Sequence, residues 1–470
     1  MSTQRRMDLS ALSSLHLSRR TLLSAMGLSA AGLGLAACGA PGGAGGAAAG
    51  ESNLRSEFSQ AAVNVPSEYS GRTNILFWAP FTGVNFEAVQ ALFAQFNESQ
   101  GEIYAAAESQ GSYQDLNQKF TAALQARQVP DIVCFPEMQW LQFYFSDALA
   151  PLSGYFDADW SLDVYIDNFV NEGVAAGETY VVPFARSTPL FYFNKTRFVE
   201  LGLPETGPKT WDEFAELGPA LMSVDVAGQP LRPMAFGAGD NWYGQAHAWA
   251  WGGAFSDGLS VTADSDPLRE WLTWKAKFIH QDAFGYMAQS AMTDFQTGVA
   301  AACHGSTASL RGATEGSEFD IGTAFMLGKV EEETKVPTGG SGLSIVKAES
   351  QERQDACAEL FRFLADPENS AFWHANTGYL PIVKASHETA TVQDLVASNP
   401  NFGVALDQLR NAQTADEPTW YQSGTTEIST AMAKVYGDNA DVDPTLTELQ
   451  GALEEVIDDN REDLEEVLSA

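Results

Sequence analysis

Residues 73–135 read TNILFWAPFTGVNFEAVQALFAQFNESQGEIYAAAESQGSYQDLNQKFTAALQARQVPDIVCF, and this stretch decides the fold class. Between its apolar runs, residues 86–96 and 113–125 repeat apolar side chains at the spacing of a helix. Alternating strands and helices predict an α/β fold in which helices cover a mostly parallel sheet. The apolar runs that we interpret as strands are residues 73–79, 103–107 and 131–135.

The rest of the body extends this pattern with one interruption. Residues 180–194 (YVVPFARSTPLFYFN) form an extended run with two prolines, after which helix and strand alternate again to about residue 330. Thr210 is a plausible N-cap of the next helix, with Glu213 in its first turn. Residues 350–364 have an amphipathic pattern, and residues 445–468 predict one long acidic helix. The sequence thus contains two α/β regions that are joined by extended segments.

The N-terminus has the features of an export signal. Residues 1–37 combine four arginines with a short apolar stretch, and Ser18 to Leu23 (SRRTLL) resembles a twin-arginine motif, although the general secretion route also accepts paired arginines. The sequence LAAC ending at Cys38 resembles a bacterial lipobox, so we expect cleavage before Cys38 and lipidation of that cysteine. Residues 38–71 would then be a flexible tether. The alternative is an ordinary secretory peptide with an incidental cysteine.

Composition limits the class of partner. The chain has 470 residues, with 26 Lys and Arg against 61 Asp and Glu, for a formal net charge of -35. Removing residues 1–37, which hold four arginines and one aspartate, would change the charge to -38. A phosphate backbone is bound by a basic face, so we expect no nucleic-acid partner. Docking on anionic lipid by charge alone is disfavoured for the same reason.

Motifs for catalysis and for metal binding are absent from the sequence. There is no GxxxxGK[ST], HExxH or GxSxG, and no Cys/His pair with the spacing of metal ligands. We therefore predict no cofactor, no metal and no catalytic residue. The cysteines that follow Cys38 all lie in apolar surroundings, and we expect buried free thiols there, with one disulfide and one free thiol as the alternative. They are Cys134, Cys303 and Cys357.

Aromatic residues are abundant, at 11% of the chain with 11 tryptophans. An indole offers a flat apolar surface that stacks on a sugar, or holds a quaternary ammonium by cation–π attraction. Trp242, between Asn241 and Tyr243, is the best candidate for such a role. We assign Trp249, Trp251 and Trp271 to the core.

Four stretches resemble one known family, the family 1 extracellular solute-binding proteins of ABC importers. Within that family they are most similar to the glycerol-3-phosphate, glycerophosphodiester and sugar-binding branch, especially its actinobacterial lipoproteins. The resemblance covers residues 73 to about 468. The stretches are residues 182–195 (VPFARSTPLFYFNK), 202–214 (GLPETGPKTWDEF), 339–347 (GGSGLSIVK) and 373–383 (WHANTGYLPIV).

The resemblance implies a periplasmic-binding-protein-like fold with two α/β lobes, a multi-strand hinge and a ligand cleft between the lobes. Closure of the lobes traps the ligand and presents a new surface to the permease. The first lobe would comprise residues 72–186 and 340–390, and the second residues 187–339 and 391–470. The crossings of the hinge are expected near residues 185–188, 339–344 and 382–385.

The resemblance also implies a set of ligand-binding residues. Glu137 would accept hydrogen bonds from ligand hydroxyls, Trp242 would form an apolar wall, and Tyr379 would close the site. Ser306 and the backbone N–H of Gly340 would donate to ligand oxygens. The full set is Tyr113, Glu137, Ser187, Trp242, Tyr243, Ser306, Gly340, Tyr379 and Thr426.

The chain departs from the branch at one position. The branch usually has a phosphate-binding arginine in the region that matches residues 424–429, where this sequence has Thr426 and no arginine. Three ligand classes stay open: a glycerophosphodiester or glycerol-3-phosphate-like ligand, a zwitterionic diester held by its choline and glycerol ends, and an uncharged oligosaccharide. The partners expected are this solute, the permease subunits and the membrane through the lipid on Cys38, at the outer face of the cell membrane.

Two other protein classes compete with a binding protein. A secreted carbohydrate-active enzyme needs two carboxylates about 5–5.5 or 6.5–9.5 Å apart, and Glu137 has no evident partner in the sequence. An adhesion or scaffolding lipoprotein would not need an aromatic cleft. We therefore expect a binding protein and no enzyme.

Overall fold

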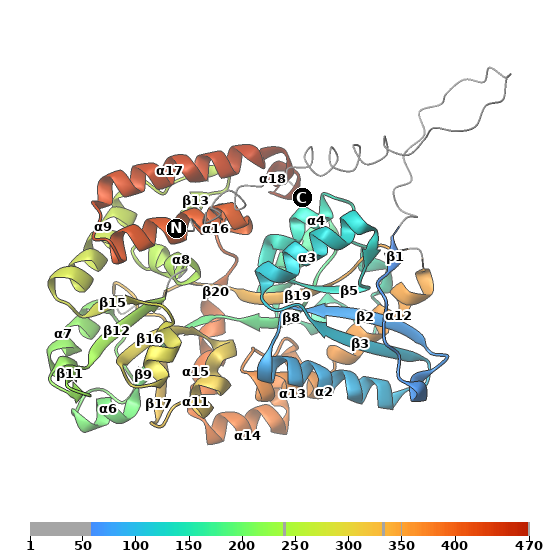
Figure 1. The fold of residues 1–470 in the computed structure, drawn as a ribbon, viewed down its shortest axis with the longest axis horizontal. Coiled ribbons are helices and arrows are strands. Elements are labelled where there is room, and N and C mark those ends of the chain that lie inside the picture. The colour runs from blue at the N-terminus through green and yellow to red at the C-terminus, as the bar shows by residue number, and fades with distance from the viewer. Residues whose placement is uncertain (1–57, 238–240, 331–333, 349, 469–470) are drawn as a thin grey trace, which may run out of the picture.

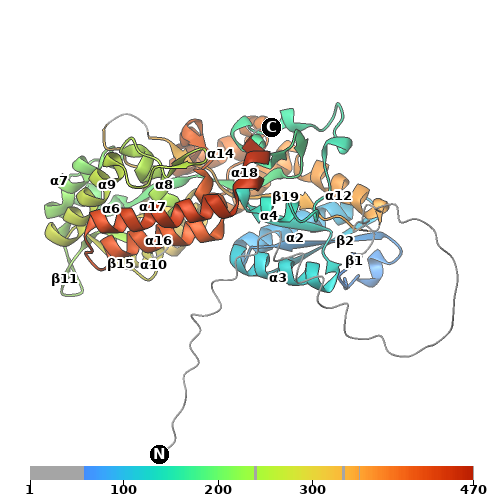
Figure 2. The ribbon, with the colours of Figure 1, turned by 90° about the horizontal axis from the view of Figure 1, so that it is seen from above.

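Two lobes, each built on a five-stranded sheet, form the computed structural model, which describes residues 58–237, 241–330, 334–348 and 350–468 (Figure 1). Figure 2 shows the lobes side by side along the long axis of the molecule. The α/β fold that the strand and helix periodicity predicts is confirmed. Residues 1–37, where we expect an export signal with the twin-arginine pattern, and Cys38 lie outside the described residues.

The first sheet has the order β3-β2-β5-β19-β8. Three of its strands come from the opening stretch and run parallel, but β19 pairs antiparallel with both of its neighbours. Because β8 is also antiparallel to β19, it runs in the same direction as β2, β3 and β5, so only β19 departs from the mostly parallel sheet that the sequence predicts. Its strands are β2 (Thr73–Ala79), β3 (Ile103–Ser109), β5 (Ile132–Pro136), β8 (Val182–Ser187) and β19 (Gly339–Ile345).

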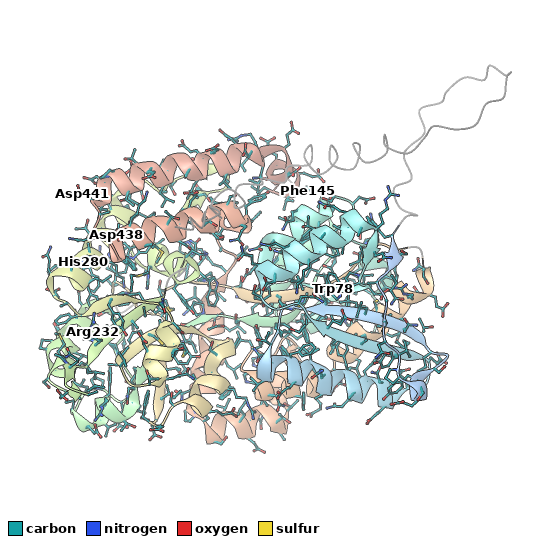
Figure 3. The ribbon with its side chains drawn as sticks, viewed as in Figure 1. Trp78, Phe145, Arg232, His280, Asp438 and Asp441 are labelled. Atoms are coloured by element: carbon teal, nitrogen blue, oxygen red, sulfur yellow. The ribbon has the colours of Figure 1, made fainter. Side chains whose placement is uncertain are left out.

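Helices cover both faces of this sheet because successive strand residues point to opposite sides. Phe77 lies in the core cluster under one layer of helices, while its neighbour Trp78, labelled in Figure 3, packs against the cluster on the other face. Ile132 and Val133 divide in the same way. The first face carries α2 (Gly83–Ser99), α12 (Gln351–Leu364) and α13 (Pro367–Thr377), and the second carries α3 (Tyr113–Ala126).

The second sheet has the order β15-β12-β16-β9-β17. Phe191 and Phe193 belong to one core cluster and Leu190 and Tyr192 to another, so this sheet is also buried on both faces. Its strands are β9 (Pro189–Asn194), β12 (Arg232–Gly237), β15 (Gly285–Ala288), β16 (Ala300–Ser306) and β17 (Ile321–Ala324). Larger helices of this lobe are α7 (Trp211–Met222), α8 (Asn241–Ala250), α9 (Asp266–Ala276) and α16 (Gln422–Tyr436).

Local sequence signals place several of these elements. Thr210 caps α7 by accepting a hydrogen bond from the backbone N–H of Glu213 (3.1 Å). The Glu213 carboxylate in turn accepts a hydrogen bond from the backbone N–H of Thr210. Trp251 and Trp271 are buried in the core as expected, whereas Trp249 is only half-buried and donates to Asp416. The thiols of Cys134, Cys303 and Cys357 are free and buried.

The chain passes between the two sheets at extended segments. Thr188 separates β8 of the first sheet from β9 of the second, so the extended run at 180–194 is a crossing. Thr338 separates β18 (Val336–Pro337) from β19. The carbonyl of Arg186 accepts a hydrogen bond from the N–H of Leu380 (2.7 Å), which ties the segment after α13 to the first crossing.

The C-terminal helix is broken, which corrects the expectation of one continuous helix over residues 445–468. α17 (Val442–Asp459) ends at Asn460, and α18 (Arg461–Leu468) follows. Leu446 and Leu449 of α17 pack in the second lobe, but Leu464 of α18 packs in a cluster with Phe120 of the first. The break therefore lets the C-terminal segment reach both lobes, as Figure 1 shows.

Candidate ligand-binding site

A cavity of about 220 Å³ lies where the two lobes meet. First-lobe residues on its wall include Glu137 and Glu172, and second-lobe residues include Trp242 and Trp420. The described residues that line it include no lysine, arginine or histidine. The remaining lining residues are Met138, Gln139, Asn241, Gln245, Thr338, Thr414, Ala415, Thr419, Gln422 and Thr425.

Glu137 enters the site at the end of a strand. β5 ends at Pro136, and Glu137 starts a short 3-10 helix (Glu137–Trp140) with a φ of 25°, a conformation that is costly for a residue with a Cβ. The backbone N–H of Gly340 donates to its carboxylate. Burial outweighs that bond and the nearby Arg186 charge, and raises the pKa of Glu137 to about 8. A carboxyl group in this state exchanges a proton near neutral pH.

Glu172 supplies a second carboxylate beside Glu137. It lies in the 3-10 turn Asn171–Gly173 and forms an ion pair with Arg186. The hydroxyl of Thr338, on the second crossing, donates to the same carboxylate. Glu172 is thus held by side chains from both crossings.

Two tyrosine hydroxyls meet near Glu137, which interacts with Tyr379. The Tyr113 hydroxyl donates to Ser341 Oγ (3.1 Å) and lies 3.4 Å from the Tyr379 hydroxyl. The Cys134 thiol also donates to Ser341 Oγ, at 3.0 Å. Burial raises the pKa of both tyrosines above the ordinary value of 10. Both therefore stay protonated at neutral pH and act as hydroxyl groups.

Trp242 lies against the second crossing. Its indole N–H donates to the carbonyl of Thr338 (3.0 Å). A Cβ on Gly339 would lie 2.3 Å from the Trp242 ring and 3.0 Å from Ser187 Oγ, so Ser187, Gly339 and Trp242 are in close contact. The glycine therefore makes room for the ring at the cavity wall.

Gly340 sits where the backbone must approach its neighbour closely. Its φ is 87°, and a Cβ there would lie 1.8 Å from the carbonyl oxygen of Ala185. Only glycine fits this position, and its N–H is left facing Glu137.

Of the expected residues, only Glu137 and Trp242 are among those that line the cavity, and Ser306, Tyr243 and Thr426 have other contacts. Ser306 accepts a hydrogen bond from Ala308 N–H (3.1 Å) and pairs with Pro189, beside the first crossing. Tyr243 stacks on His304 with ring centroids 5.2 Å apart. Thr426 is exposed on α16 and bonds to Gln422, and its neighbour Thr425 lines the cavity instead.

Sequence reasoning missed most of the lining residues, among them Glu172, Thr338, Trp420 and Thr425. Glu172 lies in a polar segment without periodicity, so nothing local marks it as buried. Thr338 carried a usable signal, because it directly precedes the glycine pair of the second crossing. Trp420 precedes α16 in a short 3-10 turn (Glu417–Trp420), and its indole N–H donates to Ala415 (2.9 Å).

Among the described residues, no group of three His, Cys, Asp or Glu is arranged to hold a metal ion. The same residues contain no helix with the length and apolar character needed to cross a membrane. What the site offers chemically is hydrogen-bond acceptors from two carboxylates, donors from hydroxyl and backbone groups, and aromatic walls.

These features define the class of protein. The family model for bacterial extracellular solute-binding proteins matches residues 91–402, and the chain belongs to that family. Its members bind a small-molecule solute outside the cytoplasm and deliver it to the permease of an ABC importer.

Several proteins of known structure or curated function are similar to this chain. The chain is similar to UgpB from Mycobacterium tuberculosis, solved in complex with glycerophosphocholine, with 32% identity, a TM-score of 0.76, and coverage of 83% of this chain and 99% of that one. It is 27% identical over 366 residues to the sn-glycerol-3-phosphate-binding periplasmic protein UgpB of Pectobacterium atrosepticum, covering 72% of this chain and 80% of the relative. The cyclic alpha-maltosyl-1,6-maltose binding protein from Arthrobacter globiformis shares the fold, at 21% identity, a TM-score of 0.70, and coverage of 82% and 99%.

Proposed function

We propose that this protein captures a zwitterionic glycerophosphodiester in the cavity between its lobes and delivers it to an importer, without catalysis. The observation that carries the proposal is the chemistry of the wall, where Glu137 and Glu172 lie with Trp242 and Trp420. Carboxylates accept strong hydrogen bonds from a glycerol diol. Aromatic faces and carboxylates together suit a quaternary ammonium.

Charge favours a diester over a phosphate monoester. The cavity lining that the structure describes holds no cationic side chain that could offset the charge of a phosphate; of its two carboxyl groups, Glu172 is paired with Arg186 and Glu137 has a raised pKa. A monoester carries about two negative charges at neutral pH, whereas a zwitterionic diester brings a positive charge of its own. The similarity to the relative solved with glycerophosphocholine supports the same ligand class.

An uncharged oligosaccharide is the second candidate. Trp242 and Trp420 on the cavity wall favour it, because indole faces stack on sugar rings. The carboxylates would accept its hydroxyls. This ligand needs no cation at all, so it too fits the wall. A catalytic role is less suited to the site, because Glu172 is held by Arg186 and Thr338.

Ligand-induced stabilisation tests the proposal. A ligand at 100 times its Kd raises the free energy of unfolding by about 2.7 kcal/mol, which a thermal-shift assay detects. We expect glycerophosphocholine to shift the melting temperature of the purified protein more than glycerol-3-phosphate, maltose or trehalose does. A shift with the sugars alone would overturn the diester and favour the oligosaccharide.

Membrane attachment is a separate part of the proposal. We propose that the chain is cleaved before Cys38 and lipidated there, because LAAC follows an apolar stretch that is preceded by arginines. Multiple acyl chains give stable anchoring, whereas one does not. The Cys38→Ser variant should move from the membrane fraction to the soluble fraction. If wild-type protein and Cys38→Ser divide equally between the membrane and soluble fractions, the proposed lipid anchor is contradicted.

A further inference from the structure

Glu172 and Arg186 form a buried pair immediately behind the cavity. Each side chain is 3% exposed, and Arg186 donates to the Glu172 carboxylate. Glu172 is among the residues that line the cavity and Arg186 is not. The Glu172 carboxylate therefore lies between the Arg186 guanidinium and the cavity.

The surroundings of Arg186 hold it in place. It lies in β8 at the first crossing, its guanidinium is 5.0 Å from the centre of the Phe169 ring, and its carbonyl accepts from Leu380 N–H. Glu137 is the other acidic group that interacts with it. The arginine thus faces two carboxylates, of which Glu172 is the one in direct contact.

Buried charges interact strongly because the surrounding medium screens them weakly. An uncancelled guanidinium this close to the cavity would attract an anionic ligand through space, even without contact. When Arg186 is paired with Glu172, the net charge of the pair is zero. The electrostatic potential in the cavity then comes from the other residues around it. The identity of residue 172 therefore sets the charge that a ligand meets.

We propose that Glu172 is a specificity-determining residue that cancels the charge of Arg186 and so makes the cavity discriminate against phosphate monoesters. The inference rests on the proposed function, because it assumes that the ligand binds in this cavity. It assigns the discrimination to a residue behind the ligand, where neither charge needs to touch the phosphate.

The test compares the affinities of two probes, glycerophosphocholine and glycerol-3-phosphate, by calorimetry at pH 6.5 and constant ionic strength. In Glu172→Gln the acceptor for Thr338 remains but the charge is lost. The ratio of the two Kd values should then shift at least ten-fold towards glycerol-3-phosphate. Glu178→Gln, an exposed acid six residues along the chain, removes the same formal charge and should leave the ratio unchanged.

Two further variants distinguish a charge effect from a structural one. Arg186→Gln leaves Glu172 uncancelled and should shift the ratio in the opposite direction. The double variant Glu172→Gln/Arg186→Gln should return it towards the wild-type ratio. A purely structural role would weaken both probes together and leave the ratio unchanged in every variant.

The outcomes separate this inference from the proposed function. Wild-type protein that binds neither probe would overturn both. Wild-type protein that binds glycerophosphocholine, with an unchanged ratio in whichever of these variants folds, would overturn the role of Glu172 alone. A ratio that shifts in Glu178→Gln as much as in Glu172→Gln would also overturn it, because net charge would then explain the effect.

Discussion

The indole N–H of Trp242 donates to the carbonyl of Thr338, 3.0 Å away, so an α8 side chain on the cavity wall is bonded to the backbone of the second crossing. The ring also fills the space that Gly339 leaves open. A single side chain thereby links the ligand surface to the segment that joins the lobes.

Replacing Trp242 by alanine should weaken ligand binding at least ten-fold, about 1.4 kcal/mol, because an aromatic wall of the cavity is lost. Trp242→Phe keeps a ring but loses the bond to Thr338, so its loss of affinity should be smaller. Calorimetry with glycerophosphocholine measures both values. If the affinity of Trp242→Ala is unchanged, Trp242 does not contact the ligand.

The raised pKa of Glu137, about 8, predicts that ligand binding releases a proton at pH 7. The free protein is then mostly protonated at this residue, and ligand hydroxyls favour the ionised form, so affinity should rise as the pH increases from 6 to 8. Calorimetry in two buffers with different ionisation enthalpies measures the number of protons released.

The control for this prediction is Glu137→Gln, which cannot lose a proton. It should abolish both the proton release and the rise of affinity with pH. Glu137→Ala should in addition weaken binding at least ten-fold, about 1.4 kcal/mol. Equal proton release in wild-type protein and Glu137→Gln would assign the titration to another group.

Gly340→Ala should destabilise the fold by more than about 2 kcal/mol, because the new Cβ would lie 1.8 Å from the Ala185 carbonyl oxygen in a backbone conformation that disfavours side chains. Gly154→Ala is the matched control, since a Cβ there meets nothing within 4 Å and should change stability by less than about 0.5 kcal/mol. Urea unfolding compares the two. Equal effects would show that the β8–β19 contact yields easily.

Two buried histidines predict a loss of stability in acid. Burial lowers the pKa of His247 and of His304 well below the ordinary 6.5, and the charge of Lys275 lowers both further. The unfolded chain therefore binds protons first as the pH falls below about 6.5, and the folded state loses about 1.4 kcal/mol per histidine for each further pH unit.

His304→Phe isolates this effect, because His304 already lies among aromatic rings, stacked against Tyr243. Between pH 7.5 and 5.5 the variant should lose less unfolding free energy than wild-type protein does. The comparison is needed because carboxyl groups with raised pKa values, such as Asp416, act in the opposite direction. Parallel pH profiles would contradict a neutral His304.

Leu464→Ala should cost about 2–5 kcal/mol, because this α18 side chain is fully buried against the first lobe. Leu468→Ala, on the same helix and 45% exposed, should be nearly neutral. Thermal unfolding measures both changes. A neutral Leu464→Ala would mean that α18 does not remain packed in solution.

Much of the fold could be predicted because its strands are buried on both faces. The continuous apolar run of β2 and the helical period of α3 identify these elements without any partner. The position of β19 between β5 and β8 could not be predicted in this way. It depends on close backbone approach at Gly340 and on pairing with strands about 150 or more residues earlier.

The site was predictable where residues follow recognisable strand ends. Glu137, expected from the family resemblance after the β5 strand, reaches the cavity, as does Trp242, which the resemblance and the aromatic pattern both indicated. Glu172 was missed because its burial depends on Arg186, a partner that only the tertiary fold provides. The α17–α18 break at Asn460 was missed because the apolar period continues across it.

Both described ends of the chain rest on the same lobe. Phe58 and Val467 pack against the cluster that contains Phe120, and Ser59 pairs with Gln128. An attachment through the residues before Phe58 would therefore connect the membrane to the first lobe and not to the second. Any change in the angle between the lobes would then displace the second lobe relative to the one that is attached.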